Sequence, residues 1–166
     1  MSYFSHYFET RIARHAVGTY YYTVVYLDTA MHDDLPLAQH ARLRIEADIS
    51  GVPVKGAWQP AKGRWYLMLP KLPLKAAGLR IGSPVEVSFR VLPQDDVDIP
   101  AVLAALLAKK SRVRKGWDAL SAGKQRGLAH MVASAKRPET IAARLTEVEA
   151  VLTGKAPLPW DRSKRR

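Results

Sequence analysis

The chain has 166 residues, which is enough for one domain, or for a domain with a helical appendage. A chain of this length can form a hydrophobic core that is stable without disulfide bonds. It contains no cysteine, which excludes a disulfide framework, a thiolate nucleophile, an iron–sulfur cluster and a zinc finger. Its 26 Lys and Arg residues outnumber 15 Asp and Glu residues, and the net charge of +11 favours an anionic partner without naming one.

The first 95 residues show the period-two alternation that is typical of β-strands. At residues 41–50 one face is apolar and the other charged. Apolar Leu43, Ile45, Ala47 and Ile49 alternate there with charged Arg42, Arg44, Glu46 and Asp48. The other predicted strands cover residues 4–13, 19–26, 52–59, 64–69 and 85–91, with a helical turn at residues 74–79. Because closure removes exposed sheet edges, we predict an α+β protein in which residues 1–95 form a small closed β-barrel of about six strands.

Residues 96–155 change to the 3.6-residue periodicity of amphipathic helices and predict a C-terminal helical module of three to four helices. Residues typical of helix boundaries mark it: Asp98 and Ser121 as N-caps, Pro138 in a first turn and Gly154 after a last turn. We expect residues 156–166, which end in Lys164, Arg165 and Arg166, to form a disordered basic tail.

Nothing near the start of the chain resembles a targeting signal. The longest apolar run, residues 99–108, has about half of the length that a membrane span requires. We therefore expect a cytoplasmic protein with no membrane span.

The sequence contains no pattern that is specific for catalysis. Neither a phosphate-binding glycine loop nor a G-x-S-x-G turn occurs, and the five histidines never have the spacing of a helical metal pair. The cluster of Asp95, Asp96 and Asp98 is more typical of helix capping than of a calcium loop. We therefore expect no metal, no cofactor and no catalytic residues, and hence a binding or accessory protein and not an enzyme.

Small barrels bind ligands at their ends, so the candidate ligand pocket is the barrel mouth near Arg64, Trp65 and Lys71. Its ligand would be a small molecule or a protein that the sequence does not identify. Three of the tyrosines in residues 20–26 fall on one face of their strand. They could stack on single-stranded nucleic acid, but tyrosines in such a strand more often fill or rim a barrel.

A basic run in the helical module is the strongest indication of a partner. Cations at helix ends are explained by the helix dipole. Five basic residues are not explained in this way and form a candidate surface for an anionic partner: Arg112, Arg114, Lys115, Lys124 and Arg126. Nucleic-acid binding by this surface is the alternative function. It is not favoured, because the sequence has no recognition helix and no aromatic–basic RNA motif.

Two parts of the chain resemble known modules. Residues 51–56, 63–67 and 77–87 are similar in order and spacing to a small bacterial β-barrel domain of unknown function. Downstream, the chain resembles the C-terminal signature of the bacteriocin-protection, YdeI/OmpD-associated family, which commonly follows that domain. The residues that carry this second resemblance are Ala135, Lys136, Arg137, Pro138, Glu139, Thr140 and Arg144. The chain departs from the family pattern at Ile141, where Arg is usual, and at Ser83 and Pro84, where the barrel domain has an acidic residue.

The resemblance implies a role in resistance to cationic antimicrobial peptides or bacteriocins, with no catalytic residues to transfer. A shorter likeness, in residues 69–87, is to the looped-hinge hairpin of AbrB-type transcription factors, which would imply DNA binding. Those proteins build their barrel from two chains and have no helical module, so the first resemblance is preferred.

Overall fold

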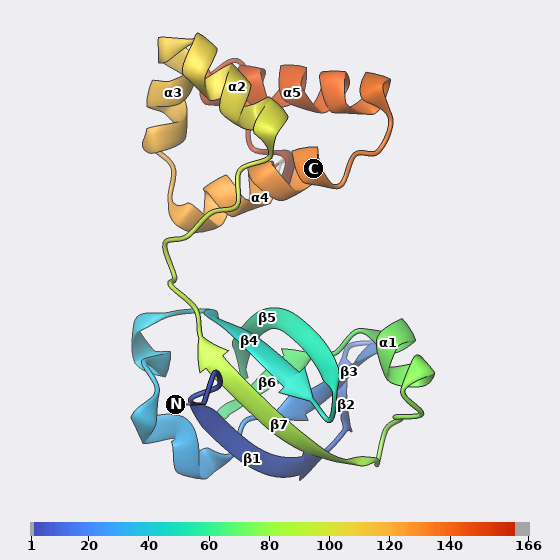
Figure 1. Cartoon of the computed structure of the whole chain (residues 1–166). Coiled ribbons are helices and arrows are strands. Elements are labelled where there is room, and N and C mark those ends of the chain that lie inside the picture. Colours follow the sequence, from blue (N-terminus) through green and yellow to red (C-terminus); the bar gives the residue numbers. More distant parts are fainter. Residues whose placement is uncertain (1, 162–166) are drawn as a thin grey trace. The chain divides into compact units, whose positions relative to one another are not determined.

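The computed structural model describes residues 2–161 and divides the chain into two compact units, Met1–Gln94 and Asp95–Arg166. We call the first the β unit and the second the helical unit. Each has a hydrophobic core of its own. Strands and helices are segregated in this way along the chain (Figure 1), which confirms the predicted α+β class. No helix within residues 2–161 is long and apolar enough to cross a membrane.

Within the described residues, the β unit contains one curled antiparallel sheet of seven strands, in the order β1-β7-β4-β5-β6-β3-β2 (Figure 1). The strands are β1 (His6–Arg11), β2 (Ala13–Val17), β3 (Tyr20–Tyr26), β4 (Leu43–Ile49), β5 (Val52–Ala61), β6 (Arg64–Met68) and β7 (Pro84–Val91). Short helical segments connect them: η1 (Thr29–Asp34), η2 (Leu37–Gln39) and α1 (Lys71–Ala76). The long strand β5 joins the two halves of the sheet, because its first part pairs with β4 and its last three residues pair with β6.

The prediction of a closed barrel is wrong, because the sheet described in residues 2–161 is not closed; it has seven strands where about six are predicted. Its end strands, β1 and β2, are consecutive in the chain and meet at Ile12, whose side chain is buried in the core. Two backbone hydrogen bonds hold this corner: Ile12 donates to Ser83 at 3.0 Å, and Gly82 donates to Ile12 at 2.7 Å. The predicted strand at residues 4–13 therefore ends at this bend as β1, and β2, which the alternation did not predict, begins at Ala13 and forms the other edge of the sheet.

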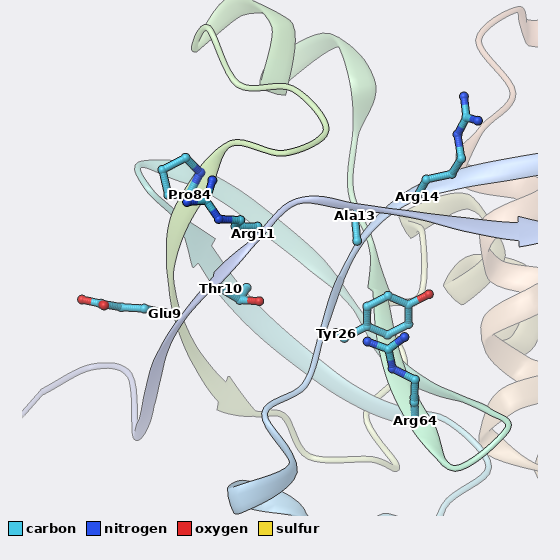
Figure 2. A pocket seen from close by; sticks show the side chains of 8 residues that line it. All are labelled: Glu9, Thr10, Arg11, Ala13, Arg14, Tyr26, Arg64 and Pro84. Carbon is cyan, nitrogen blue, oxygen red and sulfur yellow. The ribbon is translucent and has the colours of Figure 1, made fainter.

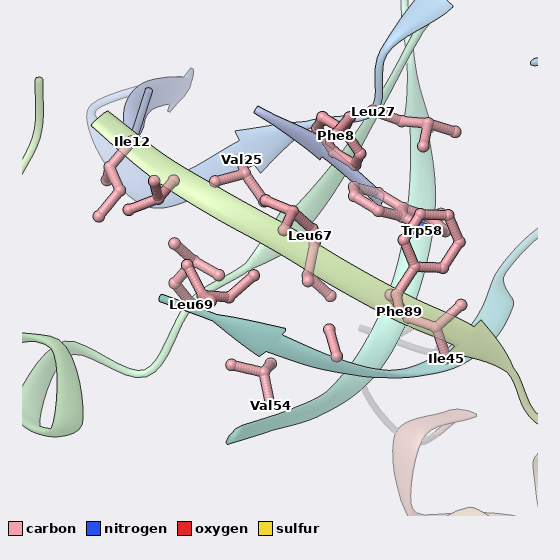
Figure 3. Close-up of a cluster of buried hydrophobic side chains, with 14 of the residues drawn as sticks. Phe8, Ile12, Val25, Leu27, Ile45, Val54, Trp58, Leu67, Leu69 and Phe89 are labelled. Atoms are coloured by element: carbon pink, nitrogen blue, oxygen red, sulfur yellow. The ribbon is translucent and has the colours of Figure 1, made fainter. Parts of the chain in front are cut away.

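The core of the β unit lies on the concave side of the sheet (Figure 3). The predicted alternation in β4 is confirmed, since its apolar side chains are all buried: Leu43, Ile45, Ala47 and Ile49. Trp58 and Phe89 pack edge to face with ring centroids 5.4 Å apart, and Phe8 contacts both rings. This packed core makes the sheet a firm support for side chains on its outer face.

Among the described residues, the helical unit has four α-helices, in agreement with the three to four predicted (Figure 1). They are α2 (Ala101–Lys109), α3 (Ser111–Asp118), α4 (Ala122–Ala133) and α5 (Pro138–Leu152). Ser121 caps α4 as predicted, because its side chain accepts a hydrogen bond from the backbone N–H of Lys124. Asp98 does not cap α2. The N-cap of α2 is Pro100, since the residue before a proline is disfavoured in helical conformation.

Close backbone approach fixes the packing of α3 on α5. Gly116 lies directly against Leu152, and a side chain at position 116 would overlap the Leu152 carbonyl group. The segment after α5 also packs on the helical unit: Leu158 contacts its core and the ring of Trp160 lies against Gly127. These contacts belong to residues 156–161. The rest of the predicted tail, with Lys164, Arg165 and Arg166, lies outside the described residues.

Candidate functional site

A groove of about 680 Å³ opens on the β unit beside the corner at Ile12 (Figure 2). It lies where the edge strand β1 passes β3 without pairing to it. Its lining residues come from β1, β2, β3, β6 and β7: Glu9, Thr10, Arg11, Ala13, Arg14, Tyr26, Arg64 and Pro84. The groove is thus a direct result of the open sheet.

One wall of the groove is an aromatic stack that supports Arg64. The Arg64 guanidinium lies over the Tyr26 ring, with its central carbon 3.6 Å from the ring centroid. The Tyr26 hydroxyl is hydrogen-bonded to Nδ1 of His15 at 2.7 Å, and the His15 ring stacks on Tyr66 at 4.4 Å. These residues meet because β3 pairs with both β2 and β6. The stack orients the Arg64 side chain and presents its charge to the groove.

The opposite wall comes from β1 and the start of β7. Nη1 of Arg11 donates a hydrogen bond to the carbonyl oxygen of Gly82 at 2.9 Å. Figure 2 shows the Arg11 side chain extending toward Pro84, away from Tyr26 and Arg64, whereas the Thr10 hydroxyl is directed toward Tyr26. The groove therefore presents the Arg64 guanidinium on one wall and the Thr10 hydroxyl on the other, with the charge of Arg11 at its rim.

Arg14 lines the groove at its far end, but its guanidinium turns away from Arg64 (Figure 2). It stacks on the ring of Tyr21, with its central carbon 4.0 Å from the centroid. The ammonium group of Lys71 lies 5.4 Å from the centroid of the same ring. Arg14 therefore extends the positive field of the groove toward the start of α1.

The three residues of the predicted barrel-mouth pocket have different positions. Arg64 lines the groove, whereas Trp65 is partly buried and packs against the core of the β unit. Lys71 is exposed at the first residue of α1. The other groove residues were not predicted, because Arg11 and Tyr26 approach Arg64 only through the strand order of the folded sheet.

The predicted basic surface lies on α3 and α4 of the helical unit. Arg114 forms an ion pair with Asp118 at 3.1 Å, and Arg126 donates a hydrogen bond to the carbonyl oxygen of Asp96 at 3.2 Å. The other three residues are exposed and form no ion pair within residues 2–161: Arg112, Lys115 and Lys124. Arg112 and Lys115 are one helical turn apart on α3, so they present neighbouring charges to solvent.

The family signature residues form the start of α5. Arg137 occupies the N-cap position, Pro138 begins the helix and Glu139 lies in its first turn. Proline is preorganised for a first helical turn, and a carboxylate there complements the helix dipole. Ala135, Lys136, Thr140 and Arg144 complete the signature around this start. This arrangement has a structural role, since it turns the chain between α4 and α5.

A titratable cluster on β4 and β7 lies outside the groove lining. Glu46 accepts hydrogen bonds from the Tyr3 hydroxyl at 2.7 Å and from Nε of Arg90 at 2.9 Å. The hydrogen bond from Tyr3, and then that from Arg90, lowers the pKa of Glu46. Correspondingly, the hydrogen bond to Glu46 raises the pKa of Tyr3. These three residues hold the N-terminal segment to the sheet, which is a structural role.

Within residues 2–161, no group of three or more His, Asp or Glu side chains is arranged to hold a metal ion.

Comparison with known proteins gives one family match. Residues 96–152, which include all four helices described for the helical unit, match the family model described as bacteriocin-protection, YdeI or OmpD-associated. No curated protein matches the chain.

Proposed function

We propose, on the premise that the helical unit belongs to the bacteriocin-protection, YdeI or OmpD-associated family, that this is a cytoplasmic accessory protein that contributes to bacterial resistance to bacteriocins or cationic antimicrobial peptides. It acts by binding and not by catalysis. The family match is the observation that carries this proposal.

The charge of the chain restricts how such protection works. With a net charge of +11, the protein repels a cationic peptide at long range and does not concentrate it. Both candidate surfaces, the groove and the exposed Arg112, Lys115 and Lys124, are also basic. Protection therefore acts through an anionic or neutral partner in the cell, and not through capture of the peptide.

The proposal is tested in a bacterial strain that lacks the gene for this chain. We expect the strain to become more sensitive to a cationic peptide, and the wild-type chain to restore resistance. The purified protein should show no binding to the fluorescently labelled peptide at about 0.15 M salt. Unchanged sensitivity of the deletion strain would contradict the resistance role, and tight peptide binding would contradict the indirect mechanism.

Nucleic-acid binding is the second candidate function, because Arg112, Lys115 and Lys124 are exposed and without ion pairs in the described part of the chain. A basic surface alone gives weak non-specific binding, with Kd of about 10⁻⁴–10⁻⁶ M and steep salt dependence. The test is a titration with duplex DNA, single-stranded DNA and RNA at about 50 and 200 mM salt. A double variant, Arg112→Glu with Lys115→Glu, is compared with a control of equal charge change on the β unit, Arg42→Glu with Lys55→Glu.

Sub-micromolar binding that survives about 200 mM salt and is lost only in the α3 variant would establish this second function. Equal weakening by both variants would show a general effect of net charge and would exclude a specific surface on α3.

A further inference from the structure

We infer that the groove of the β unit binds a small ligand that carries oxyanion groups, held by Arg64 and Thr10 in the positive field to which Arg11 and Arg14 contribute. The inference rests on the geometry of the β unit alone. It does not depend on the resistance role or on the basic surface of the helical unit.

The positive charge of the groove is not neutralised by the protein. Three arginines and one glutamate line it, and none of the three arginines forms an ion pair within residues 2–161. The glutamate, Glu9, accepts a hydrogen bond from the Tyr7 hydroxyl at 3.0 Å. The groove therefore retains a positive field that an anionic ligand can neutralise.

The guanidinium groups of Arg64 and Arg11 are each held in place before any ligand binds. Arg64 is stacked on Tyr26, which is in turn hydrogen-bonded to His15. Arg11 is anchored by its hydrogen bond to the Gly82 carbonyl group. Because a guanidinium group has five N–H donors, one such bond leaves the others for a ligand. This preorganisation lowers the entropy that binding costs.

The size and lining of the groove indicate the class of ligand. Its volume of about 680 Å³ is in the range of small-molecule sites. Polar and charged side chains line most of it, and Figure 2 shows the Thr10 hydroxyl directed toward Tyr26. Planar guanidinium groups recognise carboxylate and phosphate through paired hydrogen bonds. A compact polyanion that contacts Arg64 and Thr10 within this positive field matches these donors, whether its charges are phosphates or carboxylates.

The test is an NMR titration of the full-length, ¹⁵N-labelled protein with tripolyphosphate and, separately, with citrate. We expect saturable shifts of the amide signals of Thr10, Ala13 and Arg64 with at least one of the two probes. Arg64→Gln should weaken that binding at least about tenfold, because it removes a charged hydrogen-bonding partner. Arg64→Lys keeps the charge but loses the planar fork, so it should recover only part of the affinity.

The matched control is Arg42→Gln, which removes one exposed charge from the same unit but outside the groove lining. It should change the affinity by less than about twofold at about 0.15 M salt. Amide dispersion in the variant spectra confirms that each remains folded. Binding of tripolyphosphate alone assigns a phosphate ligand, and binding of citrate alone assigns a carboxylate ligand. The inference is wrong if neither probe shifts the groove signals, or if Arg42→Gln weakens binding as much as Arg64→Gln.

Discussion

Replacement of Gly116 by alanine tests the packing of α3 on α5. In the interior of a helix, glycine is less favourable than alanine by about 1 kcal/mol, so helix propensity alone predicts that this change stabilises α3. The structure predicts the opposite. A Cβ atom at position 116 would lie 2.9 Å from the carbonyl carbon and 3.2 Å from the Cα of Leu152, and nearer still to the carbonyl oxygen.

Ordinary contacts between carbon atoms are about 3.5–4.0 Å, so α3 and the end of α5 would have to separate by about 0.5–1 Å. The obstacle is backbone, which cannot rotate away as a flexible side chain can. Overpacking of this kind costs about 1–3 kcal/mol. After subtraction of the gain in helix propensity, we expect Gly116→Ala to lower the free energy of unfolding of the helical unit by up to about 2 kcal/mol.

Gly123 in α4 is the matched control, because a Cβ atom there would meet nothing within 4 Å. Gly123→Ala should therefore raise the free energy of unfolding by about 0.5–1 kcal/mol. The assay is thermal unfolding followed by the helical far-UV circular dichroism signal, where each 1 kcal/mol lost lowers Tm by about 4–8 °C. If Gly116→Ala raises Tm as Gly123→Ala does, the close approach to Leu152 is not a constraint and the reasoning is wrong.

Three further predictions follow from the packing and the ionisable groups. The folded-state pKa of Glu46 is lowered, so Glu46 stabilises the protein above its unfolded-state pKa, and this stability is lost as pH falls through the lowered value. Between about pH 7 and about pH 3, the free energy of unfolding should therefore fall less for Glu46→Gln than for the wild type. Trp58→Ala should lower the free energy of unfolding of the β unit by about 3–5 kcal/mol in urea, because the ring is fully buried, and a loss below about 1 kcal/mol would contradict its central place in the core. Lys110→Ala should lower the free energy of unfolding of the helical unit by no more than about 1 kcal/mol, since the ion pair with Glu149 is partly exposed, and a double-mutant cycle measures that coupling.

The sequence predicts features that depend on neighbouring residues. Alternation places Leu43 and Ile45 in the core correctly, because one face of a strand faces the core wherever the sheet is buried on one side. The cap at Ser121 follows from the preference of a hydroxyl for unpaired N–H groups at a helix start. The start of α2 was placed too early because the effect of Pro100 on the residue before it outweighs the capping preference of Asp98.

Features that depend on distant residues were not predictable in this way. The bend at Ile12 leaves no local signal, since an inward-facing isoleucine continues the alternation of a straight strand. The sequence therefore predicts a closed sheet, in which the groove between β1 and β3 would have no place. Arg64 is predicted because it lies near the expected barrel mouth, whereas Arg11 can be identified only once β1 and β2 are known to be opposite edges of one sheet.

The placement of consecutive strands at opposite ends of the sheet has a consequence for synthesis of the chain. Among the described strands, β1 pairs with β7 alone, with His6 opposite Phe89. The first strand to be synthesised therefore has no pairing partner until the last strand has been made. The hairpins β2–β3 and β4–β5 are local and can form earlier. Until β7 emerges, β1 and one side of β4 remain unpaired, and this is the interval in which the nascent protein is most exposed to wrong strand pairing. The helices that follow β7 arrive after that interval has ended, and their core forms from residues close together in the chain.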